Sequence, residues 1–102
     1  MKLLLASFFL LASATVVSAT DGQQVYTQYG CMACHVVDGA GGQVGPSLDG
    51  VGEKGADYIR QAIVDPNAQP VEGYPPNVMP QNYEAQMSDE ELDALVEWLA
   101  TK

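Results

Sequence analysis

The residues of this chain with the most distinctive chemistry occupy five consecutive positions, Cys31-Met32-Ala33-Cys34-His35. Two thiols separated by two residues, with a histidine directly after the second, form the spacing that attaches a haem covalently. Each thiol can add to one vinyl group at the porphyrin edge, and the adjacent imidazole is then held beneath the iron, where it can bind axially. The motif therefore predicts one covalent haem c, attached through Cys31 and Cys34, with His35 as an iron ligand.

Three other kinds of site could use the same side chains. A structural zinc site needs four nitrogen or sulfur ligands, and the chain has only two cysteines and one histidine. A redox-active C-x-x-C pair of the thioredoxin kind expects a β-α-β setting, which the sequence pattern lacks. A plain disulfide suits an exported protein but leaves His35 unexplained. Haem attachment is the interpretation that uses all of these residues.

Methionine is the candidate for the second axial ligand, because His35 is the one histidine of the chain. Of the four methionines, one is the first residue and Met32 lies inside the attachment motif. Met87 directly precedes the last expected helix and can pair with Leu92 in a hydrophobic staple, which makes it a core residue. Met79 lies in a proline-rich segment that can hold extended chain across the open side of a haem. We predict Met79 as the ligand, with Met87 in reserve.

Histidine and methionine ligation implies a six-coordinate iron of fairly high potential, which suits electron transfer. It counts against oxygen, peroxide or gas chemistry, which needs an open position on the iron. No paired acid and base or activated nucleophile stands out among the carboxylates, so we do not expect an enzyme. A haem enzyme or sensor remains the alternative if the sixth position is open.

The N-terminus has the pattern of a secretory signal peptide. Lys2 is basic, residues 3–11 are almost wholly apolar, and Val17-Ser18-Ala19 offers the small residues of a cleavage site. The alternative, an uncleaved anchor, is weakened because the run is shorter than the roughly 20 apolar residues of a spanning helix. We expect residues 1–19 to be removed, which leaves one domain at residues 20–102, exported to the periplasm or beyond and not inserted in a membrane.

The charge balance restricts the partners. Thirteen acidic side chains face four basic ones, for a formal net charge of −9. Such a balance excludes ordinary nucleic-acid binding and argues against adhesion to anionic lipid. It favours redox-partner proteins with a basic docking patch, although solubility alone accounts for the acids equally well.

Helical patterns occur at three places. Residues 22–29 have a helical face behind a capping residue, Asp21, and residues 56–64 form a second helix that Asp65-Pro66 stops. Ser88 and Glu91 form the capping box of a third, which carries an apolar stripe. The segments between them, the glycine-rich residues 38–52 and the proline-rich residues 65–87, read as loops. The chain therefore reads as a single all-α unit that needs a cofactor to complete a small core.

Together with the attachment motif, Gly45-Pro46-Ser47-Leu48, Met79-Pro80 and an amphipathic C-terminal helix make residues 21–101 resemble the class I cytochromes c. The resemblance implies an all-α cytochrome c fold, with several short helices wrapped around one covalently bound haem, and a one-electron carrier. It further implies that the carbonyl of Pro46 accepts a hydrogen bond from the His35 imidazole. It also implies that the first and last helices cross through Tyr26, Tyr29, Leu95 and Trp98.

Residues 58–80 resemble a narrower group within this family. Tyr58-Ile59-Arg60, Asp65-Pro66-Asn67, Glu72-Gly73-Tyr74-Pro75-Pro76 and Met79-Pro80 look most like the cytochrome c domain of bacterial cytochrome c oxidase subunit II. This likeness implies a haem-copper oxidase or another membrane complex as a partner. It also opens an alternative, in which the protein is a bound subunit of a membrane respiratory complex.

Overall fold

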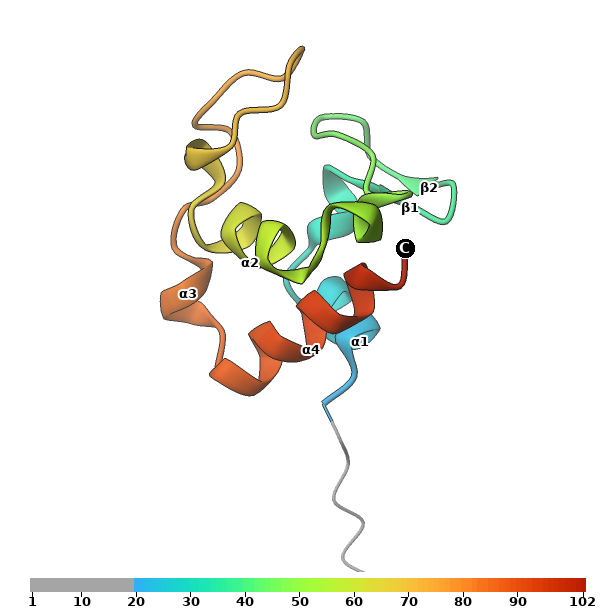
Figure 1. The fold of residues 1–102 in the computed structure, drawn as a ribbon, viewed down its shortest axis with the longest axis vertical. Coiled ribbons are helices and arrows are strands. Elements are labelled where there is room, and N and C mark those ends of the chain that lie inside the picture. The colour runs from blue at the N-terminus through green and yellow to red at the C-terminus, as the bar shows by residue number, and fades with distance from the viewer. Residues whose placement is uncertain (1–19) are drawn as a thin grey trace, which may run out of the picture.

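The computed structural model describes residues 20–102, and the predicted signal peptide at residues 1–19 lies outside the described residues. The elements follow in the order α1 (Gly22–Gln28), the 3-10 turn η1 (Cys31–Ala33), β1 (Val36–Val37), β2 (Ala40–Gly41), η2 (Val51–Lys54), α2 (Ala56–Val64), η3 (Pro66–Ala68), α3 (Tyr83–Gln86) and α4 (Asp89–Ala100). The expected all-α class is confirmed (Figure 1). Within the described residues, none of the helices has the length and apolar character required to span a bilayer.

The first helix begins at the predicted residue and ends one residue earlier than predicted, with Tyr29 as its C-cap. The Asp21 carboxylate accepts a hydrogen bond from the backbone N–H of Gln23 at 2.9 Å, which caps α1. Val25 and Tyr26 are buried on one face. After α1, Gly30 adopts a left-handed conformation with φ of 70°, so the chain turns directly into the cysteine segment.

The second helix, α2, has the predicted bounds. Ile59 and Ile63 lie one turn apart on its buried face. The chain leaves the helix at Asp65, because Pro66 disfavours helical geometry in the residue before it.

The last helix carries both predicted features of its start. The backbone N–H of Glu91 donates to Ser88 Oγ at 3.1 Å, and the backbone N–H of Ser88 donates to Glu91 Oε1 at 3.0 Å, which completes the capping box. Met87 and Leu92 are both 7% exposed and belong to one core cluster, as the staple requires. The apolar stripe of α4 is buried at Leu92, Leu95, Val96 and Leu99.

Helices α1 and α4 cross at close range (Figure 1). At Gly22, a Cβ would lie 2.1 Å from the carbonyl oxygen of Ala94, so the crossing requires glycine at this position. The rings of Tyr26 and Trp98 lie beside the crossing, with centroids 5.1 Å apart. The aromatic partner of Tyr29 is Tyr83 of α3, at 6.3 Å and nearly perpendicular.

A short hairpin was not expected. Strands β1 and β2 pair antiparallel, with Val36 opposite Gly41 and Val37 opposite Ala40. The two residues between them, Asp38 and Gly39, both have positive φ, of 53° and 77°, as a type I′ turn requires. The Asp49 carboxylate holds this turn by accepting from the backbone N–H groups of Asp38 and Gly39 at 2.6 and 3.1 Å.

The expectation that residues 65–87 have no regular structure is wrong in part. Pro66 starts η3, where its fixed φ suits the first helical position. Helix α3 begins at Tyr83, and the ring of Tyr83 packs against Tyr29. Residues 69–82 between η3 and α3 form a largely exposed loop, which we call the methionine loop because it carries Met79.

Candidate functional site

The two cysteines lie in and directly after η1, the turn that follows the left-handed Gly30. Both thiols are free, half-buried and face one cavity. Burial raises the pKa of the Cys31 thiol, with a further upward effect from Cys34. A reactive redox pair relies on a lowered thiol pKa, so the environment of Cys31 counts against thioredoxin-like chemistry.

The His35 ring makes one hydrogen bond, to the backbone of the glycine-rich segment. Its Nδ1 lies 2.7 Å from the carbonyl oxygen of Pro46. A carbonyl can only accept, so Nδ1 must carry the ring proton and Nε2 keeps a free lone pair. An imidazole in this tautomer is ready to bind a metal through Nε2, and the Pro46 carbonyl raises its basicity.

Two further neighbours hold His35 in place. A Cβ at Gly45 would lie 2.7 Å from His35 Cε1 and 3.0 Å from Nδ1, so the ring occupies space that only glycine leaves open. From α1, Tyr26 Oη donates to the His35 carbonyl oxygen at 3.2 Å. Burial raises the pKa of Tyr26, with smaller contributions from Cys31 and Asp49, so this hydroxyl stays protonated and can donate. Gly45, in the glycine-rich segment, therefore packs directly against the histidine of the attachment motif.

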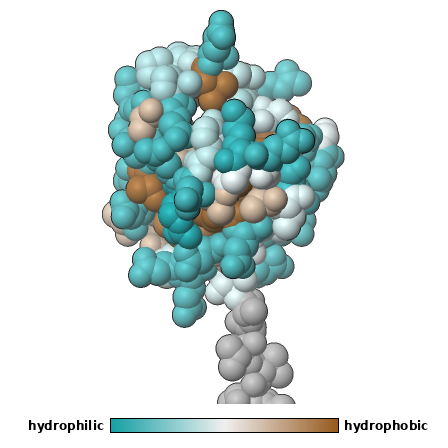
Figure 2. All heavy atoms as spheres, viewed as in Figure 1, coloured by the Kyte–Doolittle hydropathy of each residue, from teal (hydrophilic) through white to brown (hydrophobic). Residues whose placement is uncertain are grey.

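The cavity beside these residues has a volume of about 360 Å³, within the range of cofactor pockets. Its walls come from distant parts of the chain and are mainly apolar: Val51 of η2, Ile59 and Ile63 of α2, and Leu95 and Leu99 of α4. Figure 2 shows apolar atoms in the hollow of this face, with hydrophilic atoms around them. Cys31, Cys34, His35 and Met79 reach it from the remaining sides.

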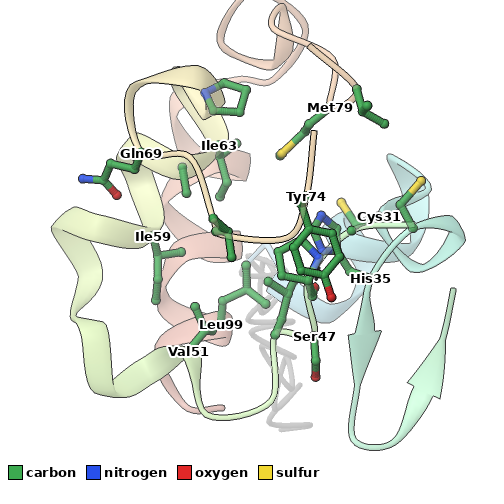
Figure 3. A pocket seen from close by; sticks show the side chains of 18 of the residues that line it. Cys31, His35, Ser47, Val51, Ile59, Ile63, Gln69, Tyr74, Met79 and Leu99 are labelled. Carbon is green, nitrogen blue, oxygen red and sulfur yellow. Dashed lines mark hydrogen bonds between the residues drawn. The ribbon is translucent and has the colours of Figure 1, made fainter. Parts of the chain in front are cut away.

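The two candidate methionines differ in their setting. Met79 is half-buried in the methionine loop, and Figure 3 shows its sulfur pointing into the cavity, with His35 on the other side. Met87 also borders the cavity, but it is 7% exposed and packed in the core at the start of α4. The arrangement brings the predicted attachment residues, His35 and Met79 to one apolar cavity.

The residues of this cavity fit a covalently held haem. Two thiols, an imidazole with Nε2 free and a thioether provide the donor types for attachment and for two axial bonds. A flat apolar group would find Ile59, Ile63 and Leu99 along its face. Among residues 20–102, no three His, Cys, Asp or Glu side chains cluster as a metal site would need, which disfavours zinc.

Comparison with known families gives a match over the whole of the described chain. The family described as Cytochrome c matches residues 19–102. The chain therefore belongs to the cytochrome c family, binds one covalent haem c and is a c-type cytochrome electron carrier. No curated protein and no solved structure matches the chain.

Sequence reasoning missed two groups at this site. Tyr26 was expected only to contact the last helix, and the bond of its hydroxyl to His35 depends on how α1 meets η1. The amide pair of Asn67 and Asn77, which borders the cavity, joins η3 to the methionine loop. No spacing rule would have found either group, whereas the Asp38-Gly39 dipeptide was a usable signal for the hairpin.

Proposed function

We propose that this protein is an exported single-electron carrier in which His35 and Met79 bind the haem iron from opposite faces. The observation that supports this most directly is that His35 and Met79 border the same apolar cavity. The hydrogen bond at Nδ1 leaves Nε2 of His35 free to bind a metal. Two axial ligands leave no open position on the iron, which suits electron transfer and disfavours binding of small gases.

Each part of the site has a distinct task in this proposal. Bound haem supplies the one-electron chemistry of its iron. Cys31 and Cys34 hold the porphyrin edge covalently, and the Pro46 carbonyl keeps His35 in the ligating tautomer. The apolar wall formed by Ile59, Ile63 and Leu99 excludes water, and together with the Met79 thioether it favours the less charged, reduced iron.

The ligand assignment is tested by a matched pair of substitutions. Met79→Leu and Met87→Leu each remove one sulfur and nearly conserve volume, which limits the cost in packing. In the oxidised protein, the weak red absorbance band of methionine-bound iron should vanish in Met79→Leu and persist in Met87→Leu. The reverse pattern would assign Met87 instead. If the unsubstituted protein lacks the band and binds carbon monoxide readily when reduced, the sixth position is open. That result would favour a haem enzyme or sensor over an electron carrier.

The charges support a basic partner. Acidic side chains gather on α4 at Asp89, Glu90, Glu91, Asp93 and Glu97. Within residues 20–102, two of the three cationic side chains already have acidic partners: Arg60 lies 2.5 Å from Asp93, and Lys102 lies 2.9 Å from Asp38. We infer a transient contact with a basic docking patch, and the rate of electron transfer to such a partner should fall as salt is added. A rate that does not change with ionic strength would contradict steering by these acids.

The acceptor proposed from the likeness of the middle segment is a haem-copper oxidase. A diffusible shuttle requires that residues 1–19 are removed, and their basic start, apolar run and small residues at 17–19 support this. N-terminal sequencing of the natural protein should give a start at Thr20. Retention of residues 1–19 would favour the alternative, a bound subunit of a membrane respiratory complex.

A further inference from the structure

Asn67 and Asn77 form a reciprocal pair at the edge of the cavity. Asn67 Nδ2 donates to Asn77 Oδ1 at 2.8 Å, and the backbone N–H of Asn77 donates to Asn67 Oδ1 at 3.0 Å. The same Asn77 Oδ1 accepts from Gln81 Nε2 at 3.3 Å. Met79 lies between Asn77 and Gln81, so the amide of Asn77 joins the chain on both sides of Met79 to η3.

The backbone of Asn77 has a left-handed conformation, which asparagine tolerates better than most residues. Its φ is 64°, in the left-handed region that side-chain-bearing residues adopt at a cost. Most residues of the methionine loop are exposed, and the loop contributes no buried residue to the core. The pair with Asn67 therefore supplies a specific anchor two residues before the sulfur-bearing side chain.

We propose that Asn67 is the positioning residue for Met79: it fixes the left-handed Asn77 and thereby holds the Met79 sulfur in reach of the iron. This inference rests on the proposed ligation by Met79. Asn67 itself need not touch the iron, because it acts through Asn77. The three side chains involved are neutral amides, so this anchor does not change with pH over the ordinary range.

Competition by imidazole measures the anchor directly. Imidazole can bind the oxidised iron only while Met79 is displaced, so its apparent affinity rises with the fraction of protein in which the loop is open. Asn67→Ala should bind imidazole about tenfold more tightly than the unsubstituted protein, the effect of losing hydrogen bonds worth about 1.4 kcal/mol. Asn67→Asp keeps an acceptor for the Asn77 N–H but loses the donor to its side chain, so its affinity should lie between the two.

A control and a second measurement separate positioning from general loss of stability. Gln86→Ala removes an exposed side-chain amide in α3 that takes no part in the anchor, and it should leave the imidazole affinity unchanged. Hydrogen exchange of the Asn77 backbone N–H should speed up about tenfold in Asn67→Ala and remain slower in Asn67→Asp, because only the latter keeps an acceptor. Both measurements use folded holoprotein and neither depends on electron-transfer activity.

The outcomes distinguish this inference from the ligand assignment. If the red band is lost in Met79→Leu but imidazole affinity and Asn77 exchange are the same in Asn67→Ala as in the unsubstituted protein, Asn67 has no positioning role and the proposed ligation stands. If Met79→Leu keeps the band, the ligation itself fails, and the role of Asn67 fails with it. A rise in imidazole affinity of equal size in Gln86→Ala would likewise overturn the inference, since any loosened variant would then behave alike.

Discussion

Tyr29 Oη lies 3.1 Å from Glu91 Oε1 and 3.2 Å from Oε2, so the residue that ends α1 donates to the residue that closes the capping box of α4. The hydroxyl also lies 3.1 Å from the carbonyl oxygen of Gln86, the last residue of α3. One phenol thus connects the first helix, the end of α3 and the start of the last helix. The Glu91 carboxylate thus accepts hydrogen bonds both from the backbone N–H of Ser88 and from the Tyr29 hydroxyl.

This contact predicts how stability depends on acid. The backbone N–H of Ser88 is the main cause that lowers the pKa of Glu91 from its ordinary 4.5, and Tyr29 adds to it. A carboxyl with a lowered folded-state pKa stabilises the fold above 4.5 and loses that contribution as pH falls through the lowered value. Glu91→Gln should therefore be less stable than the unsubstituted protein at pH 7, and the difference should shrink in acid.

Denaturant unfolding from pH 7 to pH 3 measures this difference. Glu90→Gln, in the same exposed first turn of α4, serves as the control, because its side chain is not part of the capping box. A Glu91→Gln curve that runs parallel to that of the unsubstituted protein at every pH would show that the carboxylate charge contributes nothing.

The close packing of the His35 ring against Gly45 should not tolerate a side chain at position 45. In Gly45→Ala the new Cβ meets the ring at 2.7 Å, which forces the imidazole or the backbone to move, at a cost of about 1–3 kcal/mol. If His35 binds the haem iron as proposed, the haem absorbance spectrum should change, because the displaced imidazole would strain that bond. Gly39→Ala is a suitable control: its φ of 77° makes alanine strained, but no atom lies within 4 Å of the new Cβ. This control should lose some stability and keep its spectrum; altered spectra in both variants would argue against a specific clash with His35.

Removal of the Tyr26 hydroxyl should cost about 1 kcal/mol of stability. Tyr26→Phe keeps the contact with Trp98 but loses the hydrogen bond to the His35 carbonyl, which leaves a partly buried acceptor unpaired. Tyr74→Phe removes a hydroxyl from a side chain that is 38% exposed and should have almost no effect. Unfolding by urea, followed through the haem absorbance, compares the two, and equal losses would mean that the Tyr26 bond is not special.

Loss of the cofactor should unfold most of the chain. Four core side chains, Ile59, Ile63, Leu95 and Leu99, line the cavity, so without haem they would border an unfilled apolar space, which is costly. A Cys31→Ala, Cys34→Ala variant without haem should lack near-ultraviolet circular dichroism and unfold without a cooperative transition. A sharp, cooperative transition in that variant would show that the polypeptide folds by itself.

Local signals were readable from the sequence, and contacts between distant segments were not. Asp21, the Asp65-Pro66 pair and the Ser88–Glu91 box each act within one helical turn, and each lies where the sequence predicted. The His35–Pro46 hydrogen bond was also expected, but only through the likeness to a family. The edge-to-face contact of Tyr29 with Tyr83 and the Asn67–Asn77 pair depend on how loops meet in space, and they organise the segment that was wrongly expected to have no regular structure.

The close crossing of Gly22 with Ala94 has a consequence for the order of events in folding. Contacts between segments 72 positions apart in the sequence carry a large loop-closure entropy and form slowly. We therefore expect the contact between α1 and α4 to form late in folding. Until that contact forms, Cys31, which packs against the core shared by α1 and α4, would lack part of the burial that raises the pKa of its thiol. If Cys31 and Cys34 hold the haem as proposed, we expect covalent attachment to be easiest on the incompletely folded chain, before α1 and α4 close on each other.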